Sequence, residues 1–159
     1  MIDTIVDNAV KIFQANYMYM YDIKLLVHKF HEESLSDYGL TITDDGIDKT
    51  AQLFMDNHIL LLAEKNRKII GLIGGVATPS SFSSKEIIGQ EFMWYLEKDE
   101  RKGSIGFKLL KAFEEECKSR GAKKVIMIHM LNLNSEMMSK FYEKQGYIPM
   151  EKHFIKELQ

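Results

Sequence analysis

The chain has 159 residues, 45% of them hydrophobic and 28% charged, with a formal net charge of −2. That length suits one domain with a buried core, and the lack of a basic tail or face argues against a nucleic-acid-binding protein. No apolar run approaches the roughly 20 residues needed to cross a membrane, and the first residues lack the pattern of a signal peptide. We therefore expect a single soluble, cytoplasmic domain over residues 1–159.

The first 21 residues mix helical and extended patterns. Apolar positions in residues 1–20 fit a helical stripe, whereas Val10–Phe13 also fits a short first strand. The Tyr and Met cluster at residues 17–21 would indicate a binding or dimer surface if exposed, but burial in the core is the commoner outcome.

Two helices are expected next. Asp22 is a plausible cap for a helix that ends at Gly39, and a second helix is expected from about Asp45 to Asn57. His28 and His31 are three residues apart with no third ligand evident, so the sequence predicts no metal site.

A strand hairpin follows. Two apolar runs, His58–Ala63 and Ile69–Val76, flank the charged segment Glu64–Lys68, which is typical of a hairpin with a charged turn. The segment Thr78–Ser84 is the clearest loop in the chain by composition, and it lies where it could border a substrate pocket.

The middle of the chain combines a strand, a basic turn and a helix. Gln90–Leu96 is suited to a buried strand, Lys98–Ser104 is a charged turn, and helical spacing from Ile105 ends at Gly121. Because the free N–H groups at a helix N-terminus point into the preceding turn, this arrangement predicts an anion site. The single cysteine, Cys117, falls on the apolar stripe of the helix and is expected to be a buried hydrophobe rather than a nucleophile.

The C-terminal part alternates strands with a short helix. Lys124–Met130 fits a buried strand, Ser135–Gln145 a helix, and Tyr147–Met150 and His153–Leu158 fit two final strands. The alternation as a whole predicts one mixed α/β sheet flanked by helices.

Two motifs resemble those of the GNAT family of acyl-CoA-dependent N-acetyltransferases. The family's pyrophosphate loop reads Gln/Arg-x-x-Gly-x-Gly/Ala, and Arg101, Ser104 and Gly106 occupy its fixed places, with serine replacing the first glycine. An aromatic-Tyr-x-x-x-Gly-aromatic segment appears as residues 141–147, and the order of elements from about residue 10 also agrees. The resemblance, most similar to GNAT proteins of phage genomes, implies a mixed, mostly antiparallel sheet of about six to seven strands flanked by about four helices.

The resemblance also implies where acetyl-CoA binds. Its pyrophosphate would lie on the backbone of the turn, made of Arg101, Lys102, Gly103, Ser104, Ile105 and Gly106. The backbone of Trp94, Tyr95 and Leu96 would face the thioester, because the family splays its fourth and fifth strands apart. Asn134 and Ser135 stand near the place of an asparagine that contacts the pantetheine arm in the family.

For catalysis, the resemblance assigns Tyr142 to protonation of the leaving thiolate. Glu91 is a candidate base on the fourth strand, but Gln90 and Glu91 face opposite sides and a one-residue bulge would exchange them. A water chain, or no dedicated base, fits equally well, and His129 is a lesser candidate.

The implied function is acetyl transfer from acetyl-CoA to a primary amine of a small molecule or protein, by direct attack in a ternary complex. A non-catalytic acyl-CoA-binding or partner-binding module on the same fold is the alternative, and a structural domain without cofactor is a third reading. Expected partners are acetyl-CoA and an amine, with neither nucleic acid nor membrane, and a homodimer stays open.

Overall fold

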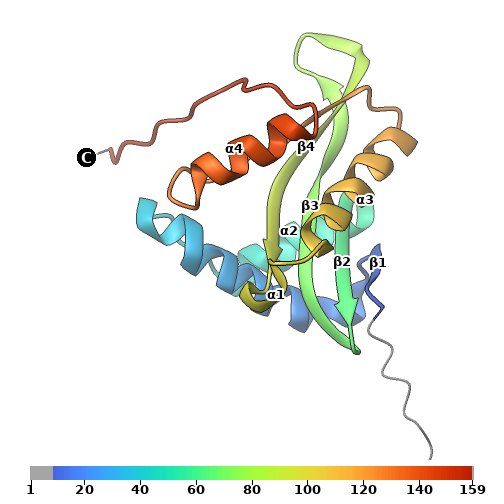
Figure 1. The fold of residues 1–159 in the computed structure, drawn as a ribbon, viewed down its shortest axis with the longest axis vertical. Coiled ribbons are helices and arrows are strands. Elements are labelled where there is room, and N and C mark those ends of the chain that lie inside the picture. Colours follow the sequence, from blue (N-terminus) through green and yellow to red (C-terminus); the bar gives the residue numbers. More distant parts are fainter. Residues whose placement is uncertain (1–8, 159) are drawn as a thin grey trace, which may run out of the picture.

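A five-stranded sheet forms the centre of the computed structural model, which describes residues 9–158 (Figure 1). Its strands, in spatial as well as chain order, are β1 (Lys11–Gln14), β2 (Ile59–Lys65), β3 (Lys68–Ser80), β4 (Ser83–Leu96) and β5 (Lys124–Ile126). Neighbours from β1 to β4 pair antiparallel, and β4 and β5 pair parallel. The mixed α/β fold predicted from the sequence is confirmed, with five strands rather than six or seven.

Within residues 9–158, four α-helices cover the two faces of this sheet. They are α1 (Met20–Phe30), α2 (Asp44–Asn57), α3 (Ile105–Ser119) and α4 (Ser135–Lys144), and a π-helical turn (His31–Leu35) continues α1. In Figure 1, α3 and α4 lie in front of the sheet, and α2 lies behind it. Among residues 9–158, no helix is both long and apolar enough to cross a membrane.

The continuous apolar run of β2 is explained by burial on both faces. Leu60 and Leu62 belong to one buried cluster, which includes residues of α1 and α2, whereas Ile59 and Leu61 belong to a second cluster with α3. Successive strand residues point to opposite faces, so the part of β2 that is covered on both sides, residues 59–63, contains no polar residue.

A β-bulge interrupts β4 where this strand pairs with β3. Glu91 pairs with Gly75 and Met93 pairs with Gly74, so Phe92 is the extra residue. The Phe92 ring lies 5.9 Å from that of Phe54 in α2, and Met93 packs against the cluster that contains Phe54. Two consecutive side chains therefore face α2, which reverses the inward and outward positions of every later residue in β4.

Of the two structures that the N-terminal sequence allowed, a helix or a short strand, the strand is present. Residues 11–14 form β1, whereas residues 1–8 of the alternative helical stripe lie outside the described region. Asp22 lies inside the first turn of α1 rather than at its cap. The expectation of burial for the Tyr and Met cluster is wrong at Tyr17, Met18 and Tyr21, which are 53%, 77% and 73% exposed.

The predicted loop Thr78–Ser84 is wrong. β3 continues to Ser80 and β4 begins at Ser83, so only two residues form the turn. This end of the hairpin projects beyond the helices (Figure 1), where neither face packs on a core. A segment rich in serine and threonine is compatible with such a solvated strand, because backbone hydrogen bonds rather than burial stabilise the strand there.

The predicted strands at the C-terminus are also wrong. Tyr147–Met150 and His153–Leu158 form no strand, and β5 ends at Ile126 rather than at Met130. A β-prone segment becomes a strand only where it meets a partner edge, and none meets these segments within the described part of the chain.

We predict that Gly75→Ala destabilises the fold by about 1–3 kcal/mol, because an added methyl group has no room beside the bulge. A Cβ at Gly75 would lie 2.2 Å from the carbonyl oxygen of Gln90 and 2.7 Å from Cζ of Phe113. Gly103→Ala is the matched control, since a Cβ there meets no atom within 4 Å. Urea denaturation measures both variants, and equal midpoints for the two would contradict the packing account.

Candidate active site

β4 and β5 separate after only three paired residues. The parallel pairing joins Ile88–Gln90 to Lys124–Ile126, and β4 then continues to Leu96 alone. From Glu91 to Leu96, the edge of β4 that faces β5 has no strand partner among residues 9–158. We call the separation between β4 and the chain after β5 the opening. α4 lies beside it, with the rings of Phe141 and Tyr142 each 6.3 Å from that of Trp94.

The register decides which β4 amides face the opening. Glu97 donates its N–H to the carbonyl of Ile70 in β3 at 2.8 Å. Alternate residues of an antiparallel strand bond to the same neighbour, so the amide of Tyr95 also faces β3. The amides of Trp94 and Leu96 consequently face the opening. Of the three residues predicted to meet the thioester, these two have the suitable backbone direction.

Glu91 spans the opening. Its Oε2 accepts a hydrogen bond from the N–H of Ile128 at 3.0 Å, and the residue is only 3% exposed. Its side chain shares the α3 face with position 89, where a Cβ would meet Cys117 of α3. Burial raises the pKa of Glu91 to about 8, with the Ile128 N–H acting in the opposite direction. The carboxyl group is thus mostly protonated at pH 7.

Tyr142 binds the backbone carbonyl of Ile128, the residue whose N–H bonds to Glu91. Its Oη donates to the Ile128 carbonyl at 3.1 Å, and its ring lies 6.3 Å from Trp94 and 5.5 Å from Tyr147. Burial, followed by the nearby charge of Glu91, raises the pKa of Tyr142 well above its usual value. Tyr142 is therefore a neutral hydrogen-bond donor at the opening.

His129 lies beside this pair, in the segment after β5 and not on the strand where the sequence placed it. Its ring stacks on Tyr142 with centroids 6.1 Å apart, and Nε2 lies 3.2 Å from the hydroxyl of Ser139. Nδ1 is buried with no hydrogen-bond partner in the described region. No group of His, Cys, Asp and Glu side chains among residues 9–158 is arranged to hold a metal ion. Cys117 is fully buried, as predicted, and burial raises its pKa to about 12.

The basic turn leads directly into α3. The first helical bond runs from the N–H of Lys108 to the carbonyl of Ser104, so the N–H groups of residues 105–107 have no acceptor inside the helix. The first turn of α3 contains no acidic residue. Ser104 has a φ of −92°, which a serine adopts without strain, so replacing the motif's glycine has no conformational cost here. A Cβ on Gly106 would come no closer than 3.6 Å to Trp94.

Arg101 is engaged within the protein. Its N–H donates to Lys98, its Nε donates to the Leu96 carbonyl at 2.7 Å, and its Nη2 donates to Oε2 of Glu33 at 2.8 Å. The guanidinium group also lies 5.2 Å above the Tyr95 ring. Burial tends to raise the pKa of Glu33, but the hydrogen bond and charge of Arg101 outweigh it and the pKa lies below its usual value. The resemblance implied that the backbone of Arg101 borders the pyrophosphate, and the sequence gave no sign of Glu33 as a partner of its side chain.

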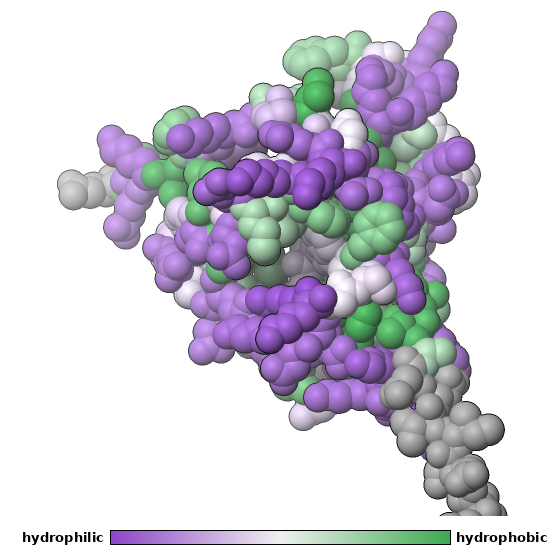
Figure 2. Space-filling view, in the orientation of Figure 1, coloured by the Kyte–Doolittle hydropathy of each residue, from purple (hydrophilic) through white to green (hydrophobic). Residues whose placement is uncertain are grey.

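The turn before α4 forms a second wall of the site. Asn134 adopts a left-handed conformation with φ 44°, and Ser135 begins the helix. Asn132 donates to the carbonyl of Ser34 at 3.1 Å and to Asp37 at 2.8 Å, which ties this turn to the π-helical turn after α1. Figure 2 shows the surface hollowed below α4, between it and the α1 side of the molecule.

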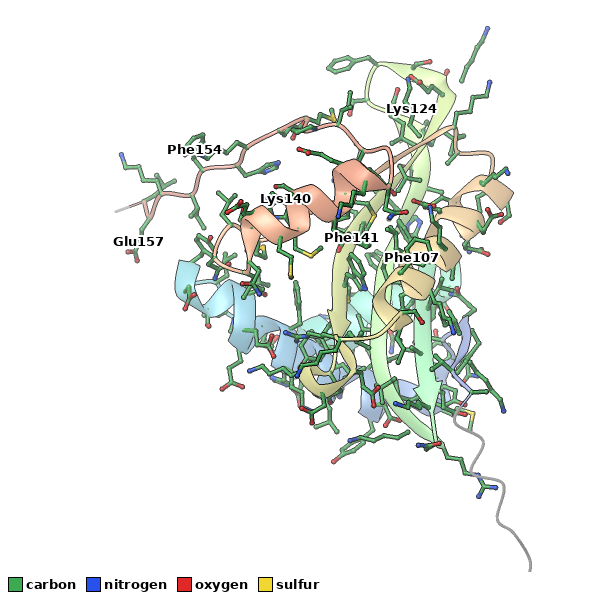
Figure 3. All side chains as sticks on the ribbon, viewed as in Figure 1. Phe107, Lys124, Lys140, Phe141, Phe154 and Glu157 are labelled. Carbon is green, nitrogen blue, oxygen red and sulfur yellow. The ribbon has the colours of Figure 1, made fainter. Side chains whose placement is uncertain are left out.

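Two hollows bear on the site. One of about 660 Å³ lies along α4 and is lined by Asn134, Ser135, Glu136, Met137, Lys140, Phe141 and Lys144. Figure 3 shows Lys140 and Phe141 on α4, with Phe107 on neighbouring α3. The other, of about 400 Å³, lies between α1 and α2 on the opposite face and has Met93 of the bulge in its wall. The sequence pointed to the first hollow through Asn134 and Ser135, and gave no sign of the second.

The profile of the acetyltransferase (GNAT) family matches residues 20–147. The chain belongs to this family. Against curated proteins, no sequence match is found.

Solved structures of GNAT acetyltransferases share the fold at low sequence identity. The ribosomal-protein-alanine N-acetyltransferase from Brucella melitensis biovar Abortus 2308 superposes with a TM-score of 0.71 at 16% identity, covering 95% of this chain and 100% of that one. The aminoglycoside N-acetyltransferase AAC(6')-Iy, bound to a CoA-S-monomethyl-acetylneamine bisubstrate analogue, gives 0.75 at 11% identity and covers 95% and 99%. A GNAT family acetyltransferase from Staphylococcus aureus subsp. aureus USA300_TCH1516 gives 0.66 at 20% and covers 94% and 99%.

We predict that Glu91→Gln removes a pH dependence of stability. Between the unfolded pKa, about 4.3, and the folded pKa, about 8, only the folded state keeps the proton. The wild-type free energy of unfolding therefore falls by about 1.4 kcal/mol per pH unit as pH rises through this window. The substituted glutamine keeps an acceptor for the Ile128 N–H without a titrating proton, so this decline should disappear.

Urea denaturation from pH 5 to pH 8 measures the effect. Glu115→Gln, at an exposed position of α3, removes a carboxyl group outside the site and serves as the control. If the free energies of unfolding of wild type and Glu91→Gln changed equally with pH, the result would contradict the raised pKa of Glu91.

Proposed function

We propose that the chain is an acetyl-CoA-dependent N-acetyltransferase that moves an acetyl group to a primary amine by direct attack in a ternary complex. The observation that carries the proposal is the open edge of β4 from Glu91 to Leu96, adjoining the uncapped N-terminus of α3 within a GNAT fold. In this proposal, backbone donors for a thioester and for a diphosphate lie beside one another. The CoA-containing complexes of a structural neighbour support the cofactor class.

The diphosphate of acetyl-CoA would rest on backbone N–H groups from Lys102 to Phe107. The dipole of α3 favours negative charge at this end by about 0.3–1 kcal/mol where the site is exposed. The side chain of Lys102 is exposed and adds positive charge, whereas Arg101 fixes the shape of the turn through Leu96 and Glu33. The backbone rather than a rigid basic pocket therefore supplies most of the binding.

The rest of acetyl-CoA would follow the walls of the opening. Asn134 and Ser135 begin α4 beside the 660 Å³ hollow, where Lys140 and Lys144 supply positive charge and Phe141 an aromatic surface. The residues present thus fit a long anionic cofactor with an aromatic base. The N–H groups of Trp94 and Leu96 can donate to the thioester oxygen, and one preorganised donor of this kind contributes about 10²–10³ in rate.

Tyr142 is the proposed donor to the departing sulfur. Its neutral hydroxyl donates to the Ile128 carbonyl, and in this proposal it would exchange that acceptor for the thiolate. Because its pKa is raised, its contribution is stabilisation of the thiolate through a hydrogen bond, with full proton transfer less favourable.

Glu91 is the proposed acceptor of the amine's proton. With a pKa of about 8, it gains a proton more readily than an ordinary carboxylate and still ionises at mildly alkaline pH. Activity limited by this group should therefore rise with pH up to about 8. Glu91 reaches the opening from the β4 side, opposite the Tyr142 wall, so the two groups suit opposite ends of one transfer step.

The acceptor class is a primary amine of a small molecule or of a protein. The structural neighbours named for ribosomal-protein alanine and for aminoglycosides both act on amines, and support this class without choosing within it. The 400 Å³ hollow between α1 and α2 is a candidate entry for the amine. Met93 of β4 lies in its wall, so only the strand β4 stands between the hollow and the open edge.

A non-catalytic acyl-CoA-binding module is the second candidate. The observation in its favour is that Glu91 and Tyr142 both already bond to Ile128. If these bonds persist with cofactor bound, the chain would hold acyl-CoA without turnover.

Acetyl-CoA binding and amine acetylation test the proposal directly. Acetyl-CoA at 100 times its dissociation constant should stabilise the fold by about 2.7 kcal/mol. Aminoglycosides, polyamines, amino acids and peptides with N-terminal alanine or lysine should be screened for amine-dependent release of free CoA thiol. Stabilisation without thiol release for any amine favours the binding module, and no stabilisation contradicts both readings.

We predict that Tyr142→Phe lowers turnover by about 10²–10⁴ while leaving CoA affinity nearly unchanged. Tyr147→Phe is the matched control, because it removes a neighbouring hydroxyl that donates to Glu114 of α3 at 2.7 Å. Steady-state thiol release and CoA titration measure the two effects. Undiminished turnover in Tyr142→Phe would remove this residue from the mechanism.

A further inference from the structure

The hollow between α1 and α2 has an apolar interior. Its volume is about 400 Å³, and Ile23, Val27, Ile47 and Leu60 provide apolar surface from both helices and from β2. The polar side chains in its wall are those of three threonines, and among the described residues none that lines the hollow carries a charge. Such a wall favours an aliphatic or aromatic group, because a charge buried there would lose its water without gaining a partner.

The acidic side chains of α2 offer no free carboxylate beside this hollow. All four are bonded within the protein, in the pairs His28–Asp44, Lys24–Asp48, Lys49–Asp45 and Tyr17–Asp56, at distances of 2.7–2.8 Å. The hydrogen bond from His28 holds the pKa of Asp44 below its usual value, so this carboxylate stays ionised and paired. A ligand with a second ammonium group would therefore have to break one of these pairs to find a partner on α2.

Met93 connects the hollow with the open edge of β4. Its side chain lines the hollow, and its backbone belongs to the stretch Glu91–Leu96, which has no strand partner on the β5 side among residues 9–158. A ligand in the hollow can thus reach the edge of the sheet without crossing another strand. Stacked sheets pack about 10 Å apart, so the interior of a hollow on one face lies roughly 5 Å from the plane of the strands.

We propose that the acceptor is a primary monoamine whose aliphatic or aromatic group occupies this hollow, with a short spacer that carries the nitrogen past Met93 to the open edge of β4. The inference rests on the proposed acetyl transfer and names the class of amine within it. Aminoglycosides and polyamines carry several ammonium groups, and both fit this hollow poorly because it offers no charge to pair with them.

The transfer step places the two parts of the monoamine in different surroundings. The neutral nitrogen bonds to the acetyl carbon at the edge of β4, and the carbon–sulfur bond breaks with its electron pair remaining on sulfur. The proton that the nitrogen loses balances the charge of the thiolate, so the products are an amide and the CoA thiol. The apolar group takes no part in these changes and contributes binding alone.

Hexylamine and 1,6-diaminohexane test the proposal as a matched pair. The two chains have the same length, and only the diamine would place an ammonium group in the hollow. Amide chemical shifts of Ile47 and Ala51, which line the hollow, report binding to ¹⁵N-labelled chain saturated with CoA. Hexylamine should shift both amides at concentrations at least tenfold lower than the diamine requires. Equal concentrations for the two amines, or no shift with either, would overturn the proposal.

Thr50→Asp should reverse this preference. Thr50 lines the hollow from α2 at an exposed position, so the substitution adds an unpaired carboxylate without removing a core contact. The ratio of the two concentrations should move at least tenfold towards the diamine. Gln52→Asp is the matched control, because Gln52 is exposed on the same helix and does not line the hollow. An equal ratio in the two variants would count against the assignment.

Thiol release with the same amines separates this inference from the acetylation on which it rests. The inference predicts that kcat/KM for hexylamine is at least tenfold above the values for 1,6-diaminohexane and for an aminoglycoside. Equal or higher kcat/KM for the polycationic amines would overturn the inference and leave the acetyltransferase function intact. Hexylamine that shifts Ile47 and Ala51 without thiol release from any amine would support the assignment of the hollow and contradict the proposed catalysis.

Discussion

The hydrogen bond from the Ile128 N–H to Glu91 is the contact on which the candidate site depends. Beyond Gln90, no ladder within residues 9–158 joins β4 to the chain after β5, and this side-chain bond of 3.0 Å spans the separation instead. A ladder bond between the strands would fill the edge of β4 with backbone partners. A side chain in its place keeps the strands connected and leaves the amides of Trp94 and Leu96 directed into the opening.

The bulge at Phe92 allows the bond between Glu91 and Ile128 to form while the later residues of β4 still pack in the core. Regular alternation from Glu91 would place Trp94 on the α2 face and Tyr95 on the α3 face. With the extra residue, Trp94 packs beside α4 while Tyr95 reaches Glu33 in the π-helical turn. The missing Cβ at Gly75 gives β4 the space for this irregularity. Site and core therefore depend on the same local departure from strand geometry.

The π-helical turn joins the two helix N-termini that border the opening. Glu33 holds Arg101 in the turn before α3, and the neighbouring carbonyl of Ser34 accepts from Asn132 in the turn before α4. The Arg101 side chain is thereby bonded to Leu96 and Glu33, contacts that its motif position did not predict. These two bonds connect the α1 side of the molecule to both turns that border the candidate site.

Sequence patterns predicted the parts of the fold that rest on burial. The runs of β2 and β3 and the stripe of α3 each carry a periodicity set by one or two covered faces. The motif at Arg101–Gly106 likewise located the turn before α3. Composition failed where pairing rather than burial decides, as in the solvated hairpin end at Thr78–Ser84 and the C-terminal segment.

Several details of the site had no clear local sequence signal. The bulge at Phe92 changes register without a glycine or proline of its own to mark it. The partner of Arg101, Glu33, lies 68 positions away in sequence, and Ile128 acts only through its backbone. Such contacts follow from the meeting of distant elements, and no local pattern encodes them.

The central claim is that backbone amides before and within the first turn of α3 hold a diphosphate beside the open edge of β4. Amide chemical shifts in a ¹⁵N-labelled chain, titrated in parallel with CoA and with pantetheine, test it most directly. The account predicts that both ligands shift Trp94 and Leu96, and that only CoA shifts residues 102–107. The account would be contradicted if CoA changed the amide shifts of residues that line the hollow between α1 and α2 and left those of residues 102–107 unchanged.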